Sequence, residues 1–230
     1  LKALDPLRET FGIDTSDNAL REAVALHNEV SRLIGEIGEY RKEENPRITG
    51  YEFAVLTIAT HCCPKDKLID KLTETLEELK TRQCDEGKKF RAKVVLVGSE
   101  IDDPDFVKLI EDAGALVVAD RYCFGSFPGR QPIELNDTED VLTQICRHTL
   151  YTGQCPRYMN TEKINQRHSY VADLARDFHA DGIIYEQMKF CDYWGYERAL
   201  ASHVLRDEYD VPVLSIDRPY VVGAAGQLRT

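Results

Sequence analysis

The sequence predicts an α/β fold in which a parallel four-stranded sheet follows a helical segment. From residue 91 onward short apolar runs alternate with helical patterns, whereas residues 1–90 carry helical patterns alone. Strands separated by helices are joined by right-handed crossovers, and this connection makes the sheet parallel. We therefore expect a helical lead-in over 1–90 and an α/β domain over 91–230, with the strands in the order 2-1-3-4.

The lead-in contains three predicted helices. Ser16 or Asp17 can cap the first, which carries apolar residues at helical spacing between Leu20 and Ile37. The Asn45-Pro46 pair ends it, and the Thr49-Gly50 pair opens the second helix. The third begins at Pro64, and its apolar stripe consists of Leu68, Leu72, Leu76 and Leu79.

Four apolar runs are the predicted strands, namely Lys93–Val97, Ala115–Ala119, Gly182–Tyr185 and Val211–Ile216. The helical patterns of this half cover roughly 104–113, 138–150, 162–180 and 196–208. In open parallel sheets, ligands bind at the carboxyl ends of the strands, near the point where the strand order reverses. For the order 2-1-3-4 this point lies between the first and third strands.

Composition restricts the setting and the partners. The formal net charge of -11 argues against nucleic acid, which is bound by basic surfaces. No apolar run is long enough to span a bilayer, and no signal peptide is visible. The 7 cysteines have irregular spacing, which does not indicate a secreted disulfide scaffold, so we expect a reducing, cytoplasmic setting. The chain starts at Leu1 without methionine and stops at Thr230 without a closing helix, and we expect it to be a segment of a longer protein.

Two cysteines follow predicted strands closely. Cys123 comes after the second strand and Cys191 after the third, while Ser99 and Asp217 follow the first and fourth. Because parallel strands end at a common edge, we expect these four residues to gather there. Two thiolates at that edge could hold a soft metal centre, since iron–sulfur clusters need cysteines that are close in space rather than in sequence. The alternative is that both are small buried hydrophobes, a frequent role of free cysteine.

The other five cysteines give weaker signals. Cys62 and Cys63 are adjacent and indicate packing, Cys84 lies in a polar connector and is expected to be exposed, and Cys146 falls in a helix and is expected in the core. The loop position of Cys155 suits a ligand and a structural turn equally well. The histidines show no paired metal spacing. Neither a Gly-x-Gly-x-x-Gly fingerprint nor a P-loop is present, so dinucleotide binding is weakly supported and ATP binding through a P-loop is not expected.

Several segments together resemble one protein family. They are Val94–Glu100, Gly114–Gly125, Ala180–Tyr185 leading to Lys189–Cys191, and Val211–Asp217 with Gly226–Thr230. In the order and spacing of these segments the chain resembles the subunits of 2-hydroxyacyl-CoA dehydratases and of the related class I benzoyl-CoA reductases. The resemblance extends over essentially the whole chain.

The resemblance implies a subunit with two flavodoxin-like α/β domains and a 4Fe–4S cluster between them. Three cysteines of one subunit usually hold that cluster. Two of them match Cys123 and Cys191, which we therefore expect to be the metal and cofactor ligands in this chain. The third belongs to an N-terminal α/β domain that would precede Leu1 and is missing here. The resemblance identifies no catalytic residue.

The same resemblance implies a reaction and its partners. A homologous sister subunit forms a heterodimer, a separate ATP-hydrolysing activator passes a low-potential electron, and the substrate is a CoA thioester. The runs 98–103, 153–157 and 191–196 look closer to the benzoyl-CoA reductases, which form a cyclic dienoyl-CoA. The alternative activity is that of an (R)-2-hydroxyacyl-CoA dehydratase, which acts through a ketyl radical. A non-catalytic docking module and a generic nucleotide-binding domain are further interpretations.

Overall fold

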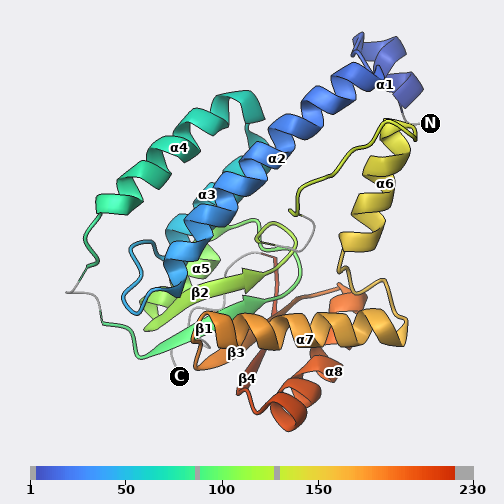
Figure 1. Ribbon diagram of the computed structural model, residues 1–230. Helices are drawn as coiled ribbons and strands as arrows, with labels where there is room; N and C mark the ends of the chain where they lie inside the picture. The colour runs from blue at the N-terminus through green and yellow to red at the C-terminus, as the bar shows by residue number, and fades with distance from the viewer. Residues whose placement is uncertain (1–3, 86–88, 127–129, 221–230) are drawn as a thin grey trace.

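The computed structural model describes residues 4–85, 89–126 and 130–220, so the segment Gly226–Thr230 lies outside the described residues. The first part of the chain is helical (Figure 1) and consists of α1 (Leu4–Phe11), α2 (Asp17–Glu39), the 3-10 turn η1 (Tyr40–Lys42), α3 (Gly50–Cys62) and α4 (Lys65–Thr81). The second part alternates strands and helices in the order β1 (Ala92–Val97), α5 (Pro104–Asp112), β2 (Ala115–Arg121), α6 (Val141–Thr152), α7 (Thr161–Asp177), β3 (Gly182–Met188), α8 (Asp192–Tyr209) and β4 (Val213–Arg218).

The four strands form one parallel sheet in the order β2-β1-β3-β4. This confirms the predicted α/β class and the predicted strand order. Each neighbouring pair is connected through at least one helix, as parallel pairing requires. The order reverses at β1, which lies between β2 and β3.

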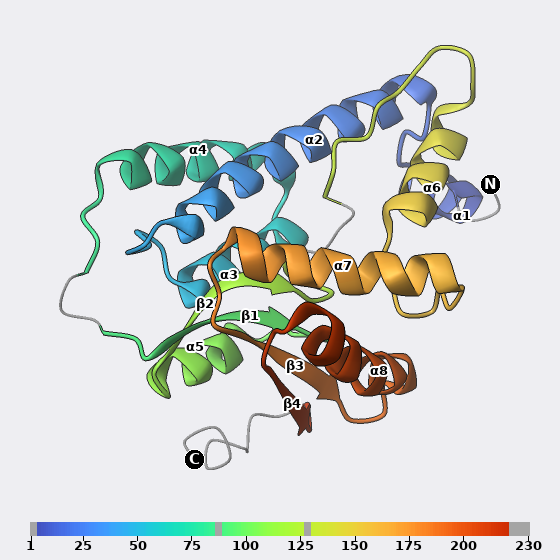
Figure 2. The ribbon, with the colours of Figure 1, turned by 60° about the horizontal axis from the view of Figure 1, so that its bottom comes forward.

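Alternate residues of the strands fill two hydrophobic clusters, one on each face of the sheet. Val95 and Val97 of β1 pack in the cluster formed with α7 and α8, whereas Val94 and Leu96 pack in the cluster formed with α3 and α5. Figure 2 shows α7 and α8 in front of the sheet and α5 behind it. Both faces of the sheet are therefore covered by helices.

The lead-in helices form a third cluster outside α3. The predicted leucine stripe of α4 is confirmed: its four leucines are buried against apolar residues of α2 and against Phe53 of α3. Ser16 caps α2 by accepting a hydrogen bond from the Ala19 amide, and Thr49 caps α3 in a capping box with Glu52. Helix α1 was not predicted; its apolar residues Leu4, Leu7 and Phe11 have helical spacing, but none of its 8 residues is buried.

Two strands run further than their apolar residues predict. β2 continues to Arg121 and β3 to Met188, and both extensions contain charged residues that are buried. A buried charged side chain needs a partner. Arg121 donates a hydrogen bond to Gln154, and Glu186 of β3 forms an ion pair with Arg218. Neither partner is near in sequence. The strand ends therefore depend on tertiary contacts.

Strand β4 begins at Val213, two residues later than predicted, because of the way α8 ends. The Val211 amide donates to the carbonyl of Leu205, which closes α8, and Pro212 has no amide hydrogen to give to a strand. The Pro212 carbonyl accepts from the Ile183 amide at 2.8 Å, and strand pairing begins one residue later, at Val213.

Candidate functional site at the carboxyl edge of the sheet

The structure brings Cys123 and Cys191 to the same edge and the same face of the sheet. Cys123 lies two residues beyond the end of β2, and Cys191 lies three residues beyond the end of β3. Both are half-buried free thiols, and both pack against the hydrophobic cluster that α7 and α8 share with the sheet. Ser99 follows β1 at this edge as predicted. Asp217 differs from the prediction, since it lies within β4, paired with Gln187, and not beyond the end of the strand.

Ser99 connects the loops that carry the two cysteines. Its carbonyl oxygen accepts a hydrogen bond from the Cys123 amide at 3.0 Å, and its hydroxyl oxygen accepts one from the Met188 amide at 2.8 Å. The carbonyl of Met188 in turn accepts from the Cys191 amide at 3.1 Å. A continuous chain of hydrogen bonds thus runs from Cys123 through Ser99 and Met188 to Cys191. It exists because β1 lies between β2 and β3.

Trp194 makes a second connection between the cysteines. Cys191 is the N-cap of α8, and Trp194 lies in the first turn of the same helix, with 2% of its surface exposed. The indole N–H of Trp194 donates a hydrogen bond to the sulfur of Cys123. The guanidinium carbon of Arg121 lies 5.2 Å from the centre of the Trp194 ring system. The aromatic ring therefore belongs to the core and also shields the Cys123 thiol.

The surroundings of Cys123 favour the neutral thiol. Burial raises the pKa of Cys123 to about 11, while the hydrogen bond from Trp194 and the charge of Arg121 act in the opposite direction. The free thiol is therefore protonated and unreactive at neutral pH. A metal that binds here must displace the proton, because thiolate is the form that ligates.

A buried ion pair supports Ser99 from inside the sheet. Glu186 has no exposed surface, and its Oε2 accepts from the amide and from the hydroxyl of Ser99, each at 3.0 Å. Its Oε1 lies 2.7 Å from Nε of Arg218, an ion pair whose N–H is not aligned for a hydrogen bond. Burial raises the pKa of Glu186, and the charge of Arg218 opposes that shift. A Cβ atom at position 98 would lie 2.7 Å from the Glu186 carbonyl oxygen, so the close approach of β1 and β3 requires Gly98.

A third thiol, that of Cys155, also lies near this edge. Its loop is held by Arg121, which is fully buried and donates to the Gln154 carbonyl at 2.5 Å and to the Gln154 side chain at 3.2 Å. Cys155 is half-buried and close enough to Cys123 to influence the charge of that thiol. The sequence left the role of Cys155 open. Its position beside Cys123 now makes it part of the same neighbourhood.

The remaining cysteines lie elsewhere, and the three predictions about their burial are wrong. Cys146 is exposed on α6 rather than buried, because this helix turns only Val141 and Gln144 fully inward. Cys62 and Cys63 are exposed rather than packed, and Cys84 is half-buried rather than exposed. Within residues 4–85, 89–126 and 130–220, no group of three or more His, Cys, Asp or Glu side chains is arranged to hold a metal ion.

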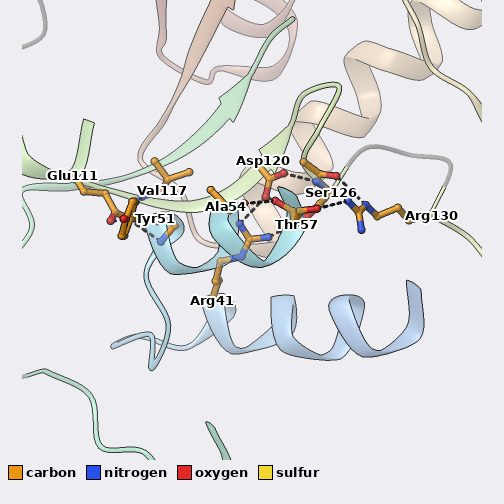
Figure 3. A network of polar contacts seen from close by, with 11 residues as sticks. Arg41, Tyr51, Ala54, Thr57, Glu111, Val117, Asp120, Ser126 and Arg130 are labelled. Atoms are coloured by element: carbon orange, nitrogen blue, oxygen red, sulfur yellow. Dashed lines mark hydrogen bonds and ion pairs between the residues drawn. The ribbon is translucent and has the colours of Figure 1, made fainter. Parts of the chain in front are cut away.

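A second polar centre fixes the far end of the Cys123 loop (Figure 3). Asp120 and Arg41 form a buried ion pair, with Oδ1 and Nη1 2.7 Å apart. The other oxygen of Asp120 accepts from the Ser126 amide at 2.5 Å. Arg130 donates to the carbonyls of Gly125 and of Thr57 in α3, at 3.0 and 3.4 Å. The loop from 122 to 126 is thus held by Ser99 on one side and by Asp120 and Arg130 on the other.

Sequence patterns gave no indication of several residues that build this site. The buried charges of Arg121, Glu186 and Arg218 sit at strand ends, where a polar residue normally indicates that the strand has stopped. Each of the three residues comes immediately after an apolar run or one residue later, and this position is the one signal in the sequence that could have identified them. Their partners, however, lie in distant segments and could not be predicted.

The family model of the D-component of 2-hydroxyglutaryl-CoA dehydratase matches residues 2–230. The chain belongs to this family. The match confirms the resemblance to this family that the segments around the two cysteines indicated. It covers the helical lead-in as well as the α/β part of the chain.

Relatives of the chain include several proteins with more specific names. The Escherichia coli K12 protein YjiM, provisionally named as a dehydratase subunit, is 24% identical over 100% of this chain and 60% of its own length. The beta subunit of (R)-phenyllactyl-CoA dehydratase of Clostridium sporogenes is 22% identical, over 93% of this chain and 52% of its own length. A subunit of the benzoyl-CoA reductase of Thauera aromatica is 23% identical, over 92% of this chain and 55% of its own length. The chain thus spans between 52% and 60% of the length of these relatives.

None of the described helices is both long enough and apolar enough to cross a membrane.

Proposed function

We propose that this chain is part of an enzyme subunit that acts on CoA thioesters, and that Cys123 and Cys191 are two of the protein ligands of a 4Fe–4S cluster. The observation that carries the proposal is the double connection between the two thiols. One connection is the hydrogen-bond chain through Ser99, and the other is the bond from Trp194 to the Cys123 sulfur. Both connections bring cysteines from separate loops to one edge of the sheet.

The donor set suits an iron–sulfur cluster in part. Thiolates are the ligands that such clusters require, and free, half-buried cysteines at a strand edge can supply them. The described residues hold no complete ligand set, so the proposal takes a third cysteine from an N-terminal α/β domain, as the resemblance implies. When bound, the cluster supplies one-electron transfer to the substrate.

The residues around the thiols position the ligands and exclude water. The Ser99–Glu186 hydrogen bonds fix the end of β1, and the Asp120 contacts fix the other end of the Cys123 loop. Trp194 covers the inner side of Cys123. Ligands held in this way need little rearrangement when the metal binds, and a dry surrounding protects reactive intermediates from side reactions.

The proposal includes two kinds of protein partner. The three relatives cited above are named as subunits, which supports assembly with a homologous sister subunit. The sequence contains no P-loop, which supports a separate ATP-hydrolysing activator as the source of low-potential electrons.

For the reaction we propose reduction of benzoyl-CoA to a cyclic dienoyl-CoA. This choice rests on the resemblance of three segments to the benzoyl-CoA reductases, namely 98–103, 153–157 and 191–196. Dehydration of a 2-hydroxyacyl-CoA is the second candidate. It is favoured by the description of the family model and by the relative named as (R)-phenyllactyl-CoA dehydratase. Incubating the complete anaerobic complex with benzoyl-CoA and, separately, with a 2-hydroxyacyl-CoA decides between the two by which product forms.

The test of the ligand assignment is iron and sulfide analysis of the complete subunit, purified without air together with its partner. We expect Cys123→Ser and Cys191→Ser each to lose most of the iron, because thiolate is replaced by a weak hydroxyl ligand. Cys146→Ser is the matched control, since this cysteine is exposed on α6, and it keeps its full iron content. Full iron in either edge variant contradicts the assignment, and a colourless, iron-free complex supports the docking-module alternative.

A further inference from the structure

Five basic side chains from separate segments gather next to the Cys123 loop. They are His27 of α2, His61 of α3, Lys65 at the start of α4, Arg130 and His148 of α6. His27 lies within electrostatic range of Lys65, Arg130 and His148, and His61 lies within range of Arg130 and Lys65. We call this group the basic patch. Each of the five side chains is half-buried or exposed, so a ligand in solution can reach the patch.

Arg130 and His61 form the inner part of the basic patch. Nη2 of Arg130 lies 2.9 Å from Nε2 of His61. Because a guanidinium can only donate, this ring nitrogen must be the acceptor. The other ring nitrogen of His61 bonds to the backbone of Phe124, whose ring also meets the imidazole edge-on at 5.3 Å. His61 is therefore held as the neutral tautomer against Phe124, the residue that follows Cys123.

Lys65 and Arg130 are held by the last turns of α3. Lys65 Nζ donates to the carbonyl of Thr60 at 3.1 Å, and Arg130 donates to the carbonyl of Thr57 at 3.4 Å. Figure 3 shows Arg130 extended toward Thr57. Carbonyl oxygens orient the two cations but do not cancel their formal charges.

No carboxylate of the described residues forms an ion pair with the basic patch. Among the ion pairs formed by the described residues, none includes Lys65 or Arg130. The acid that faces Arg130 is Asp120, and it is already paired with Arg41. Burial, followed by the charges of Arg130 and Lys65, lowers the pKa of His61 to about 4. Among the residues that the structure describes, Lys65 and Arg130 therefore form no ion pair, and the nearby carboxylate of Asp120 is shared with Arg41.

We propose that the basic patch is a binding site for a phosphoryl group. A lysine ammonium supplies a point charge for phosphate, an arginine guanidinium supplies several directed N–H donors, and the imidazole of His27 supplies a further N–H donor. The phosphoryl group comes either from free phosphate or diphosphate, or from the nucleotide end of a CoA thioester. The second source rests on the proposed function. In that case the site holds the charged end of the substrate on the far side of the Cys123 loop.

The test is a calorimetric titration of the full chain with inorganic pyrophosphate, with the ionic strength held constant by chloride. We expect saturable binding, and we expect Lys65→Gln and Arg130→Gln each to weaken it about tenfold or more, the loss that follows from about 1.4 kcal/mol of lost interaction. Lys71→Gln is the matched control, because it removes one charge from an exposed site on α4 and should leave the affinity within twofold. Circular dichroism checks that each variant folds, and Lys65→Gln alone is decisive if Arg130→Gln does not fold.

Competition by free CoA identifies the source of the phosphoryl group. Displacement of pyrophosphate by CoA supports the nucleotide end of the substrate, and binding of pyrophosphate without displacement supports free phosphate. Absence of saturable binding overturns the site, as does an equal loss of affinity in Lys71→Gln. None of these measurements requires iron, so loss of the ligand assignment in the complete subunit leaves this site standing, and absence of pyrophosphate binding leaves the ligand assignment standing.

Discussion

Replacing Glu197 tests whether the buried ion pair between α7 and α8 stabilises the part of the fold that presents Cys191. Arg167 and Glu197 are 1% and 4% exposed and form two parallel hydrogen bonds, of 2.8 and 2.7 Å. Arg167 also donates to the Tyr158 carbonyl at 2.7 Å, in the loop after Cys155. The pair thus joins α7, the start of α8 and the Cys155 loop.

The expected loss in Glu197→Gln is large because a guanidinium remains buried without its counter-charge. Breaking a buried pair by removing one partner costs about 3–5 kcal/mol. The pKa of Glu197 gives a second value for this loss of stability, and it is of similar size. Burial alone raises the pKa of Glu197, but the bonds from His168 and Arg167 outweigh it and lower the pKa to about 2, from an ordinary value of 4.5. At 1.36 kcal/mol per pH unit this difference corresponds to about 3 kcal/mol of stability at neutral pH.

The sign of the pH dependence follows from the same shift. Because the folded-state pKa of Glu197 lies below its unfolded value, its contribution is fully present above about pH 4.5 and is lost as the pH falls toward 2. Urea unfolding followed by far-ultraviolet circular dichroism at pH 7 and pH 3 measures both effects. Glu197→Gln should show a much lower midpoint at pH 7 and a smaller additional loss at pH 3 than the unmodified chain.

The control is Glu74→Gln, which breaks the exposed pair with Lys71 and should cost less than about 1 kcal/mol. The double variant Arg167→Met with Glu197→Leu should be more stable than Glu197→Gln, since it removes the unpaired charge together with its partner. A loss below about 1 kcal/mol in Glu197→Gln, equal to the loss in the control, would refute the reasoning.

Two further predictions concern the edge of the sheet. Gly98→Ala should destabilise the chain by about 1–3 kcal/mol, because its new methyl group would overlap the Glu186 backbone, whereas Gly35→Ala on α2 has open space around it and should be neutral or slightly stabilising. Equal unfolding midpoints for the two variants would contradict the close approach of β1 and β3. Trp194→Phe removes the N–H bond to the Cys123 sulfur, so the pKa of that thiol should rise above about 11 and its alkylation at fixed pH should slow. Unchanged or faster alkylation would mean that this hydrogen bond does not act on the thiol.

Much of the fold followed from periodic patterns. The leucine stripe of α4 and the four apolar strand cores are local signals, because a buried face requires apolar residues at the spacing of its own element. The ends of β2 and β3 were missed because Arg121 and Glu186 look like the start of loops. Cys146 was misplaced because a helical position does not reveal which side of α6 the rest of the fold covers.

The sequence by itself determined the class of the fold, the strand order and the position of Cys123 and Cys191 after two strands that end at one edge. Only the tertiary structure decided how these thiols are connected. The serine between them, the tryptophan that reaches from α8 to Cys123 and the five basic side chains beside the loop come from segments far apart in the chain. The physical reason is that a local pattern records which face of an element is buried, whereas the partner of a buried polar group is chosen by how the crossovers fold back on the sheet.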